Sequence, residues 1–392
     1  MNRRRLIASS SAALLAGGGI WYGFDGKSVL VNDDVAYSSW ADWQAGGGPK
    51  PLRFVRAAIL ASSPHNTQPW RFRVGDSFVE LYLETTRSVR GLDPYLREAH
   101  IGMGCALENL ALSAAANGFA ASILIPDGSL ETQQVESPLR LLARVGLSDA
   151  TPDESELYSA IPKRHTNRSL YDKNAALPPG FKEELLSTCN VGEEARLFLF
   201  GERMQQEELS RISAEANFEL YSDPDVEGGS EEWIRWRPAA IKEHQDGLTI
   251  DNFGLPPTTA AFAKIAPIWM LKRASAPEHR SAMYETQFLS APLIGVIAVR
   301  DRMSKRQSLI AGRLWQRAHL LATARGVAAR PCNEAIEMID HERHLNPARR
   351  ISALTGVIGD SSWQPTFLFL MGKPSLAAHL SPRRTLEKVV IS

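Results

Sequence analysis

The sequence predicts an α+β fold built from two diverged halves of one chain. Strand-like and helix-like stretches are mixed without the regular β-α-β alternation of a doubly wound sheet. A stretch of small and apolar residues at 104–118 aligns without a gap with residues 312–326, and both stretches end at a glycine. The length of 392 residues is sufficient for two closely packed halves.

We exclude residues 1–30, called the leader below, from the predicted fold because their composition differs from that of the rest of the chain. Three arginines, Arg3 to Arg5, precede an apolar stretch of small residues at 8–24. This stretch is shorter than the roughly 20 residues of a membrane-crossing helix, which excludes a multi-pass membrane protein. It is a targeting element, a single marginal anchor, or an accidental basic start before a buried helix. No Ala-x-Ala cleavage site follows, so its removal stays open.

The first half is expected over residues 31–160. Alternating and amphipathic patterns predict a helix at 52–61, strands at 70–74 and 78–84, the helix of the repeat, and a strand at 121–125. The faces of the repeat helix carry almost only apolar or small residues, which indicates a buried helix in close contact with its neighbours. A polar stretch at 148–159 is the expected join to the second half.

The second half is expected over residues 161–392. Its predicted elements are a helix at 179–188, a strand at 195–200, a polar tryptophan-rich helical stretch to 242, a turn-rich segment at 244–259, a helix at 282–289, a strand at 293–299, the second repeat helix at 309–325, and a strand at 366–371. Two equivalent buried helices therefore predict two equivalent halves.

Composition narrows the class of partner. Basic and acidic residues are both 44 in number, so no overall field attracts nucleic acid. The three cysteines are far apart and odd in number, which excludes a disulfide-built scaffold and a cysteine-ligated zinc cluster. The expected partner is a small molecule or another protein.

The first candidate site is the polar loop that leads into the strand at 70–74. It contains Ser62, Ser63, Pro64, His65, Asn66 and Gln68. Hydroxyl and amide groups on a proline-stiffened loop provide the fixed donors and acceptors that a planar cofactor needs along its edge. The alternative is a helix-to-strand turn rich in capping residues, which the same residue types also build.

The second candidate site is a basic run that contains Arg164, His165, Thr166 and Arg168. Arginine presents a planar fork of donors to phosphate oxygens, and a neighbouring hydroxyl adds another donor. The alternative is a solvated basic turn.

Both segments resemble motifs of the nitroreductase superfamily, whose members bind FMN. Residues 62–72 resemble the Ser-x-x-x-Asn-x-Gln-Pro-Trp-x-Phe loop that lies against the flavin ring, and residues 161–172 resemble the Arg-rich start that holds the FMN phosphate and pyrimidine. Two further matches are the turn with Pro331, Cys332 and Asn333, whose backbone faces the flavin N5 edge in the family, and the closing pair Arg383 and Arg384, which adds phosphate contacts. The resemblance extends from about residue 52 to 390.

The order of the two motifs is reversed with respect to an ordinary nitroreductase chain. There the Arg-rich start precedes the loop in each subunit, and each FMN lies between two subunits. Here the first half keeps only the loop and the second half only the Arg run. The resemblance therefore implies a nitroreductase-like intrachain pseudo-dimer of the Acg-type branch, with one FMN between the halves and no need for oligomerisation.

The leader is similar to a twin-arginine signal. This resemblance implies recognition by the twin-arginine export machinery, which carries folded proteins, and a periplasmic or membrane-anchored location.

The resemblance implies an FMN-dependent oxidoreductase that reduces a nitroaromatic, quinone or similar acceptor through the flavin, without a catalytic side chain. NAD(P)H is the family's donor, although an exported protein would need another one. The alternative is a protein that stores or shields flavin and has little or no reductase activity, with residues 244–259 as a cover.

Other patterns are weaker. Gly102-x-Gly104 lacks the third glycine and the acidic partner of a dinucleotide fingerprint, and His341 to His344 lack the His-Glu-x-x-His spacing of a zinc site. No metal site is therefore predicted. Arg235 and Arg237 stay open as phosphate ligands.

Overall fold

The computed structural model describes residues 35–45, 50–132, 137–190, 192–343 and 349–391. The expected leader, residues 1–30, lies outside the described residues. Among the helices of the described ranges, none combines the length and the apolar character needed to cross a membrane.

The first half is an antiparallel sheet covered by helices. Its elements are α2 (Ser38–Ala41), α3 (Lys50–Ala58), β1 (Trp70–Val74), β2 (Phe78–Glu84), α4 (Arg97–Ala116), β3 (Phe119–Leu124), β4 (Leu139–Asp149) and α5 (Glu156–Ala160). The strand order is β1-β2-β4-β3, and each neighbouring pair runs antiparallel.

The second half repeats this plan. Its corresponding elements are α6 (Phe181–Cys189), β5 (Ala195–Phe200), β8 (Leu293–Val299), α13 (Lys305–Ala324), β9 (Ala328–Pro331) and β10 (Gln364–Gly372). The strand order is β5-β8-β10-β9, again antiparallel throughout. Strands and helices follow one another in the same order in both halves, so the predicted α+β fold with two diverged halves is confirmed.

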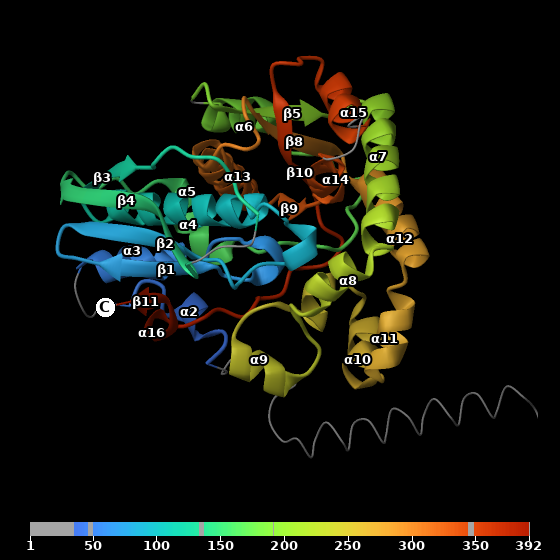
Figure 1. Ribbon diagram of the computed structural model, residues 1–392, viewed down its shortest axis with the longest axis horizontal. Helices are drawn as coiled ribbons and strands as arrows, with labels where there is room; N and C mark the ends of the chain where they lie inside the picture. The colour runs from blue at the N-terminus through green and yellow to red at the C-terminus, as the bar shows by residue number, and fades with distance from the viewer. Residues whose placement is uncertain (1–34, 46–49, 133–136, 191, 344–348, 392) are drawn as a thin grey trace, which may run out of the picture.

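The two repeat helices, α4 and α13, cross between the sheets (Figure 1). One constant shift in residue number relates both ends of α4 to both ends of α13. The same shift relates their closest contacts. A Cβ atom on Gly104 would lie 2.0 Å from the Leu309 carbonyl oxygen, and one on Gly312 would lie 2.0 Å from the Ile101 carbonyl oxygen. The crossing is thus a local pseudo-twofold axis that requires glycine on both helices.

The halves differ most in the connection between their first two strands. A tight turn at 75–77 joins β1 to β2, whereas a long helical insertion joins β5 to β8. The insertion consists of α7 (Arg203–Tyr221), α8 (Pro224–Glu231), β6 (Ile234–Arg235), α9 (Pro238–His244), β7 (Leu248–Thr249), α10 (Pro257–Ile265), α11 (Ile268–Ala274) and α12 (Pro277–Ser290). Figure 1 shows these helices along one side of the two-sheet body.

The end of the chain returns to the first half. After β10, the short helix α16 (Leu386–Val389) leads into β11 (Val390–Ile391), which pairs in parallel with β1. The first half therefore depends on residues from both ends of the sequence for its complete sheet.

Most predicted elements are present, and four of them, β1, β2, β5 and β8, have the predicted bounds. Among the elements that the sequence analysis did not predict are β4, α10, α11, α14 (Glu334–Glu342) and α15 (Arg349–Ile358). The expected join at 148–159 begins inside β4 and includes α5.

Candidate functional site

One large cavity of about 740 Å³ lies where the two halves and the insertion meet. Segments that are distant in sequence converge on it, among them α4, β9, the polar loop and the basic run. Of the predicted site residues, the following line it: Ser62, Ser63, Pro64, His65, Thr166, Arg168, Pro331 and Asn333. Their convergence was the central expectation from the sequence.

The polar loop has an unusual backbone. His65, Asn66 and Gln68 have φ values of 45°, 56° and 50°, in the left-handed region that residues with a Cβ seldom adopt. The Ser63 hydroxyl stabilises the bend because it accepts a hydrogen bond of 3.0 Å from the Gln68 amide. Such clusters of unfavourable backbone geometry persist where the surrounding structure enforces them, often at functional sites.

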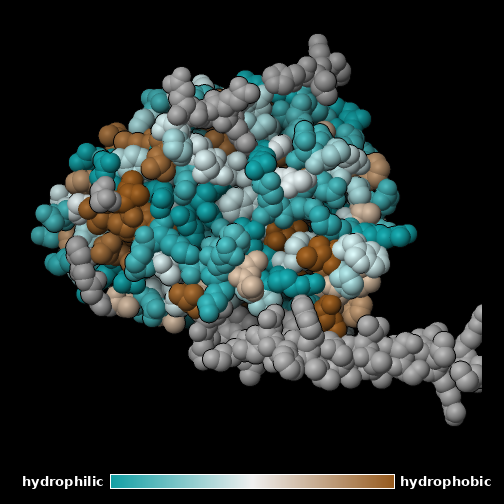
Figure 2. Space-filling model, turned by 60° about the horizontal axis from the view of Figure 1, so that its bottom comes forward, coloured by the Kyte–Doolittle hydropathy of each residue, from teal (hydrophilic) through white to brown (hydrophobic). Residues whose placement is uncertain are grey.

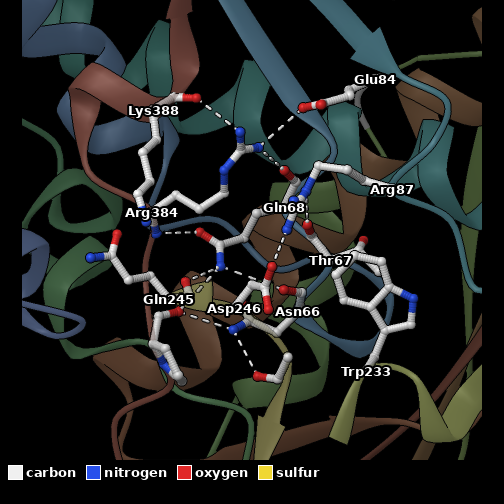
Figure 3. A network of polar contacts seen from close by, with 12 residues as sticks. Asn66, Thr67, Gln68, Glu84, Arg87, Trp233, Gln245, Asp246, Arg384 and Lys388 are labelled. Carbon is white, nitrogen blue, oxygen red and sulfur yellow. Dashed lines mark hydrogen bonds and ion pairs between the residues drawn. The ribbon is translucent and has the colours of Figure 1, made fainter. Parts of the chain in front are cut away.

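Asn66 and Gln68 are fully engaged by other parts of the chain (Figure 3). The Asn66 side-chain amide donates to the carbonyl oxygens of Gly247 and Pro382, at 3.0 and 2.9 Å. The Gln68 side chain donates to the Gln245 carbonyl at 2.9 Å and accepts from the Arg384 amide at 2.8 Å. These two residues hold the loop in place and do not line the cavity.

Arg384 belongs to the same network. Its guanidinium donates to the Gln68 carbonyl at 3.1 Å and pairs with Glu84 at 3.3 Å. On the other side of the loop, Arg87 donates to the Thr67 carbonyl and pairs with Asp246 of the insertion (Figure 3). The network therefore joins the loop, the insertion and the chain end.

Arg164 and Arg383 form a second, deeply buried cluster beneath the loop. Arg164 donates to the Leu60 carbonyl at 3.0 Å, and Arg383 donates to the Ala61 carbonyl at 3.2 Å. Trp40 of α2 covers the cluster: its ring lies 4.6 Å from the Arg383 guanidinium and 4.6 Å from the His165 ring.

The charge of this cluster is uncompensated. In the described ranges, no carboxylate lies within ion-pair distance of Arg164 or Arg383. The Nε atoms of both arginines are buried without a hydrogen-bond partner. Burial, together with the nearby Arg164 charge, lowers the pKa of Arg383 well below its usual value, and burial lowers the pKa of Arg164 to about 10. Two adjacent buried cations of this kind favour a bound anion.

The cavity wall itself carries three more arginines, Arg168, Arg280 and Arg330. Burial, with the neighbouring Arg330 charge, lowers the pKa of Arg168 to about 10. Arg330 is 8 % exposed, and its Nε and Nη1 atoms have no hydrogen-bond partner. His65 accompanies them as a neutral group, because burial and the charges of Arg168 and Arg280 lower its pKa to about 3.

The turn after β9 contributes backbone as well as side chains. Pro331 and Asn333 line the cavity, whereas Cys332 lies behind them with its amide bound to the Leu368 carbonyl at 2.8 Å. Burial raises the pKa of the Cys332 thiol, so it stays a neutral, unreactive thiol.

The insertion provides the apolar cover of the cavity. The predicted cover at 244–259 contributes Leu248, Ile250 and Phe253 to the lining, and α10 to α12 extend it. Phe262 and Met283 line the cavity and yet are 46 % and 52 % exposed, so the cavity opens to solvent beside them. Figure 2, in which the lower side of Figure 1 comes forward, shows apolar side chains at the surface in separate clusters among polar ones.

Several lining residues were not foreseen from the sequence. Glu98, Trp315, Arg330, Glu334 and Glu337 all face the cavity. Trp315 lines the cavity and also packs against Phe369, with ring centroids 4.7 Å apart. Arg330 and Glu334 flank the predicted turn, and this proximity is the one sequence signal that could have identified them.

Arg235 and Arg237, left open as phosphate ligands, have structural partners. Arg235 pairs with Asp246 at 2.5 Å. Arg237 donates to the carbonyl oxygens of Lys264 and Ala266, at 3.0 and 2.7 Å. Both residues thus hold the insertion together.

A scan against protein-family models gives no match for this chain. In sequence, the chain is similar to two Mycobacterium tuberculosis proteins assigned by name to the NAD(P)H nitroreductases. One is 34% identical over 117 residues, which are 29% of this chain and 32% of that protein. The other, named acg, is 38% identical over 69 residues, 18% of this chain and 21% of that protein. The matched region thus spans about a third or less of these relatives.

Solved structures of low sequence identity also align with the chain. The FMN-dependent nitroreductase of Mycobacterium smegmatis in complex with NADPH is 11% identical, with a TM-score of 0.35 over 59% of this chain and 96% of that one. A nitroreductase of Desulfitobacterium hafniense with bound FMN is 11% identical, with a TM-score of 0.35 over 61% of this chain and 98% of that one.

Proposed function

We infer that this chain is an FMN-binding oxidoreductase of the nitroreductase superfamily, with one flavin in the cavity between its two halves. The observation that carries this inference is the convergence of three separate segments on one cavity. The polar loop, the basic run and the turn after β9 are far apart in sequence, and all three line the same space. The sequence similarity to nitroreductases supports the same conclusion.

The residues present fit FMN in charge and in shape. The cavity is large enough for a flavin ring and a second small molecule, and Ser62 and Ser63 provide hydroxyl groups at its edge. Arg164 and Arg383 do not line the cavity, but they are buried beneath the polar loop without a compensating carboxylate, and their charges would attract the phosphate. Arg168 and Arg330 would face the ring, where their charges stabilise electron density.

Bound FMN would supply the transfer of electrons or hydride between a donor and an acceptor. The residues of the chain bind, orient and exclude water. The strained loop fixes its hydroxyl groups, and the apolar side chains of the insertion keep water away from the reacting atoms. Because burial lowers the pKa of His65 and raises that of Cys332, His65 has no imidazolium proton to donate at neutral pH and Cys332 is not a thiolate nucleophile.

The expected acceptor is a nitroaromatic, a quinone or a similar flat compound, and the expected donor is NAD(P)H or another reductant. The names of the related proteins support NAD(P)H as the donor.

A second candidate function is the storage or shielding of flavin, and the cover supports it. Leu248, Ile250 and Phe253 of the predicted cover lie on the cavity wall, where they limit access for a nicotinamide.

The test of the proposed function is the flavin content of the purified full-length protein. We expect a flavin absorbance spectrum and FMN as the released cofactor. Replacement of Arg164 by Ala should weaken FMN binding by roughly tenfold or more, because it removes a desolvated charge-assisted contact. The control is Arg53→Ala, which changes an exposed arginine on α3.

Thermal unfolding of both variants separates loss of cofactor from loss of fold. Absence of flavin from the wild type, or unchanged affinity in a folded Arg164→Ala protein, would contradict the proposal.

We also propose that the protein is exported by the twin-arginine route and is periplasmic or membrane-anchored. Arg3 and Arg4 followed by a short apolar stretch support this. Lys at both positions should retain the protein in the cytoplasm, as measured by fractionation. A wild-type protein found entirely in the cytoplasm would contradict export.

A further inference from the structure

The inner wall of the cavity carries three carboxyl groups that the proposed flavin site does not use. Glu98 lies in the first turn of α4, and Glu334 and Glu337 lie in the first turn of α14. Glu98 and Glu337 are only 6 % and 5 % exposed. One oxygen of each of the three carboxyl groups is buried without a hydrogen-bond donor.

The nearest basic groups are already occupied. Arg97 and Arg302 both pair with Asp340, each at 2.7 Å, and Arg97 reaches Glu98 only at 3.7 Å. Asp93 accepts from the backbone amides of Glu98 and Ala99, at 3.1 and 2.9 Å. Around Glu98 and Glu337, carboxyl groups therefore outnumber guanidinium groups.

Arg168 and Arg280 of the cavity wall do not correct this excess. Arg168 donates to the Asn252 carbonyl at 3.2 Å, and Arg280 donates to the Ser275 carbonyl at 2.7 Å. The positive charges of both arginines oppose the rise in the pKa of Glu334. The other carboxyl oxygen of Glu334 accepts a hydrogen bond of 3.3 Å from the Asn217 side chain. Apart from the positive charge of Arg97, the charged groups that influence Glu98 and Glu337 are other carboxyl groups.

The protonation of the carboxyl groups reflects this environment. Burial, followed by the neighbouring carboxylates, raises the pKa of Glu337 well above its usual value. Burial also raises the pKa of Glu98, although the Arg97 charge opposes the shift. A proton therefore compensates the excess negative charge, and a cationic ligand would do the same.

We propose that Glu98 and Glu337 form a subsite for the ammonium group of a cationic organic acceptor. The proposal rests on the proposed function, because the acceptor shares the cavity with the flavin. An ammonium group has three N–H donors, and the unpartnered oxygens of Glu98, Glu334 and Glu337 are buried acceptors at the same wall.

The apolar part of the acceptor has matching surroundings. Ile101 follows Glu98 on α4, and Phe367 and Trp236 line the same cavity. The exposed mouth beside Phe262 and Met283 gives a flat, partly apolar molecule a route of entry. Its ammonium group would end at the buried carboxyl groups.

The experiment compares two ligands of similar size, 4-nitrobenzylamine, which carries an ammonium group at pH 7, and uncharged 4-nitrobenzyl alcohol. Equilibrium binding to the full-length protein is measured by calorimetry, next to its flavin content. We expect the wild type to bind the amine at least about tenfold more tightly than the alcohol, the usual value of one charge-assisted contact.

The double variant Glu98→Gln with Glu337→Gln should lose this preference and retain its affinity for the alcohol and its flavin. Glu342→Gln is the control, because Glu342 is buried on the same helix outside the cavity lining and pairs with Arg350. It should keep the preference for the amine.

Equal affinity of the wild type for both ligands, or loss of both ligands in the double variant, overturns the subsite. Absence of flavin from the wild type contradicts the proposed function instead, and the calorimetric preference for the amine still decides the subsite. The two failures are therefore distinguishable.

Discussion

Single side chains in the polar loop have roles that their residue types do not reveal. Asn66 and Gln68 were predicted to contact the flavin, and the structure binds both side chains to backbone groups from the insertion and the chain end. These partners are more than a hundred residues away in sequence. Sequence reading could recognise polar groups on a bent loop, but it could not tell which of them face inward until the distant partners were known.

Burial of a titratable group has a measurable consequence at His100. The side chain is 1 % exposed, and burial lowers its pKa to about 4, although the Leu96 carbonyl at 2.6 Å opposes the shift. At pH 5.5 the imidazole is neutral in the folded protein and protonated in the unfolded chain. The wild type should therefore lose about 1.4 kcal/mol of stability on going from pH 7.5 to 5.5 relative to His100→Gln.

The measurement is the free energy of unfolding in urea at both pH values. The sign follows from the lowered pKa of His100. The stability that neutral His100 contributes to the fold is retained above pH 6.5 and is lost as the pH falls towards 4. If the difference in unfolding free energy between the wild type and His100→Gln is the same at both pH values, His100 titrates with its ordinary pKa in the folded protein.

At the scale of elements, the hairpin strands were predictable because their patterns are regular. β1, β2, β5 and β8 have the predicted bounds. β4 was missed because its register shifts opposite Leu81 and Tyr82, so Leu142 and Ala143 are buried in succession and the period of two is broken. Neither α10 nor α11 was predicted from the sequence, because a proline stands at the first position of α10 and at the N-cap of α11.

The crossing of α4 and α13 gives a sharp prediction. Gly104→Ala should lower the free energy of unfolding by about 1–3 kcal/mol or more, because the new Cβ would meet the Leu309 carbonyl. The matched control is Gly356→Ala in α15, where nothing lies within 4 Å and alanine should be neutral or stabilising by about 0.5–1 kcal/mol. Urea unfolding measures both, and equal stability of the two variants would be incompatible with the close crossing.

The insertion can be tested as a cover. Glycine in place of Pro256 and Pro257 should loosen the start of α10, since both prolines restrict the backbone there. If the cover limits access of the donor, the loosened protein should be reduced faster by NADPH. Stopped-flow bleaching of the flavin measures the rate, with dithionite as the reference reductant.

Rapid reduction of the intact protein by NADPH would reject flavin storage. No reduction by NADPH in either protein would reject a nicotinamide-dependent reductase.

At the scale of the whole molecule, the sequence predicted a single site between the halves, and its segments do converge on one cavity. The insertion, by contrast, could be read from the sequence as helical but not placed. Its position over the cavity depends on contacts such as Asp246 with Arg87, which join segments far apart in the chain.

One flavin per chain is the corresponding prediction. The polar loop occurs only in the first half and the basic run only in the second, so a second site lacks both components. The ratio of flavin absorbance to protein concentration, measured on the monomer fraction from gel filtration, should be one. A ratio of two, or flavin bound only in a dimer fraction, would contradict a single intrachain site.

The glycine crossing has a consequence for inheritance. In a symmetric homodimer one codon specifies both sides of a contact on the twofold axis, so every substitution there appears twice. In this chain Gly104 and Gly312 are specified by separate codons, and yet each glycine lies against the backbone of the other helix. Each codon is constrained by a backbone carbonyl of the other helix, so the close crossing requires that two separate codons both keep glycine.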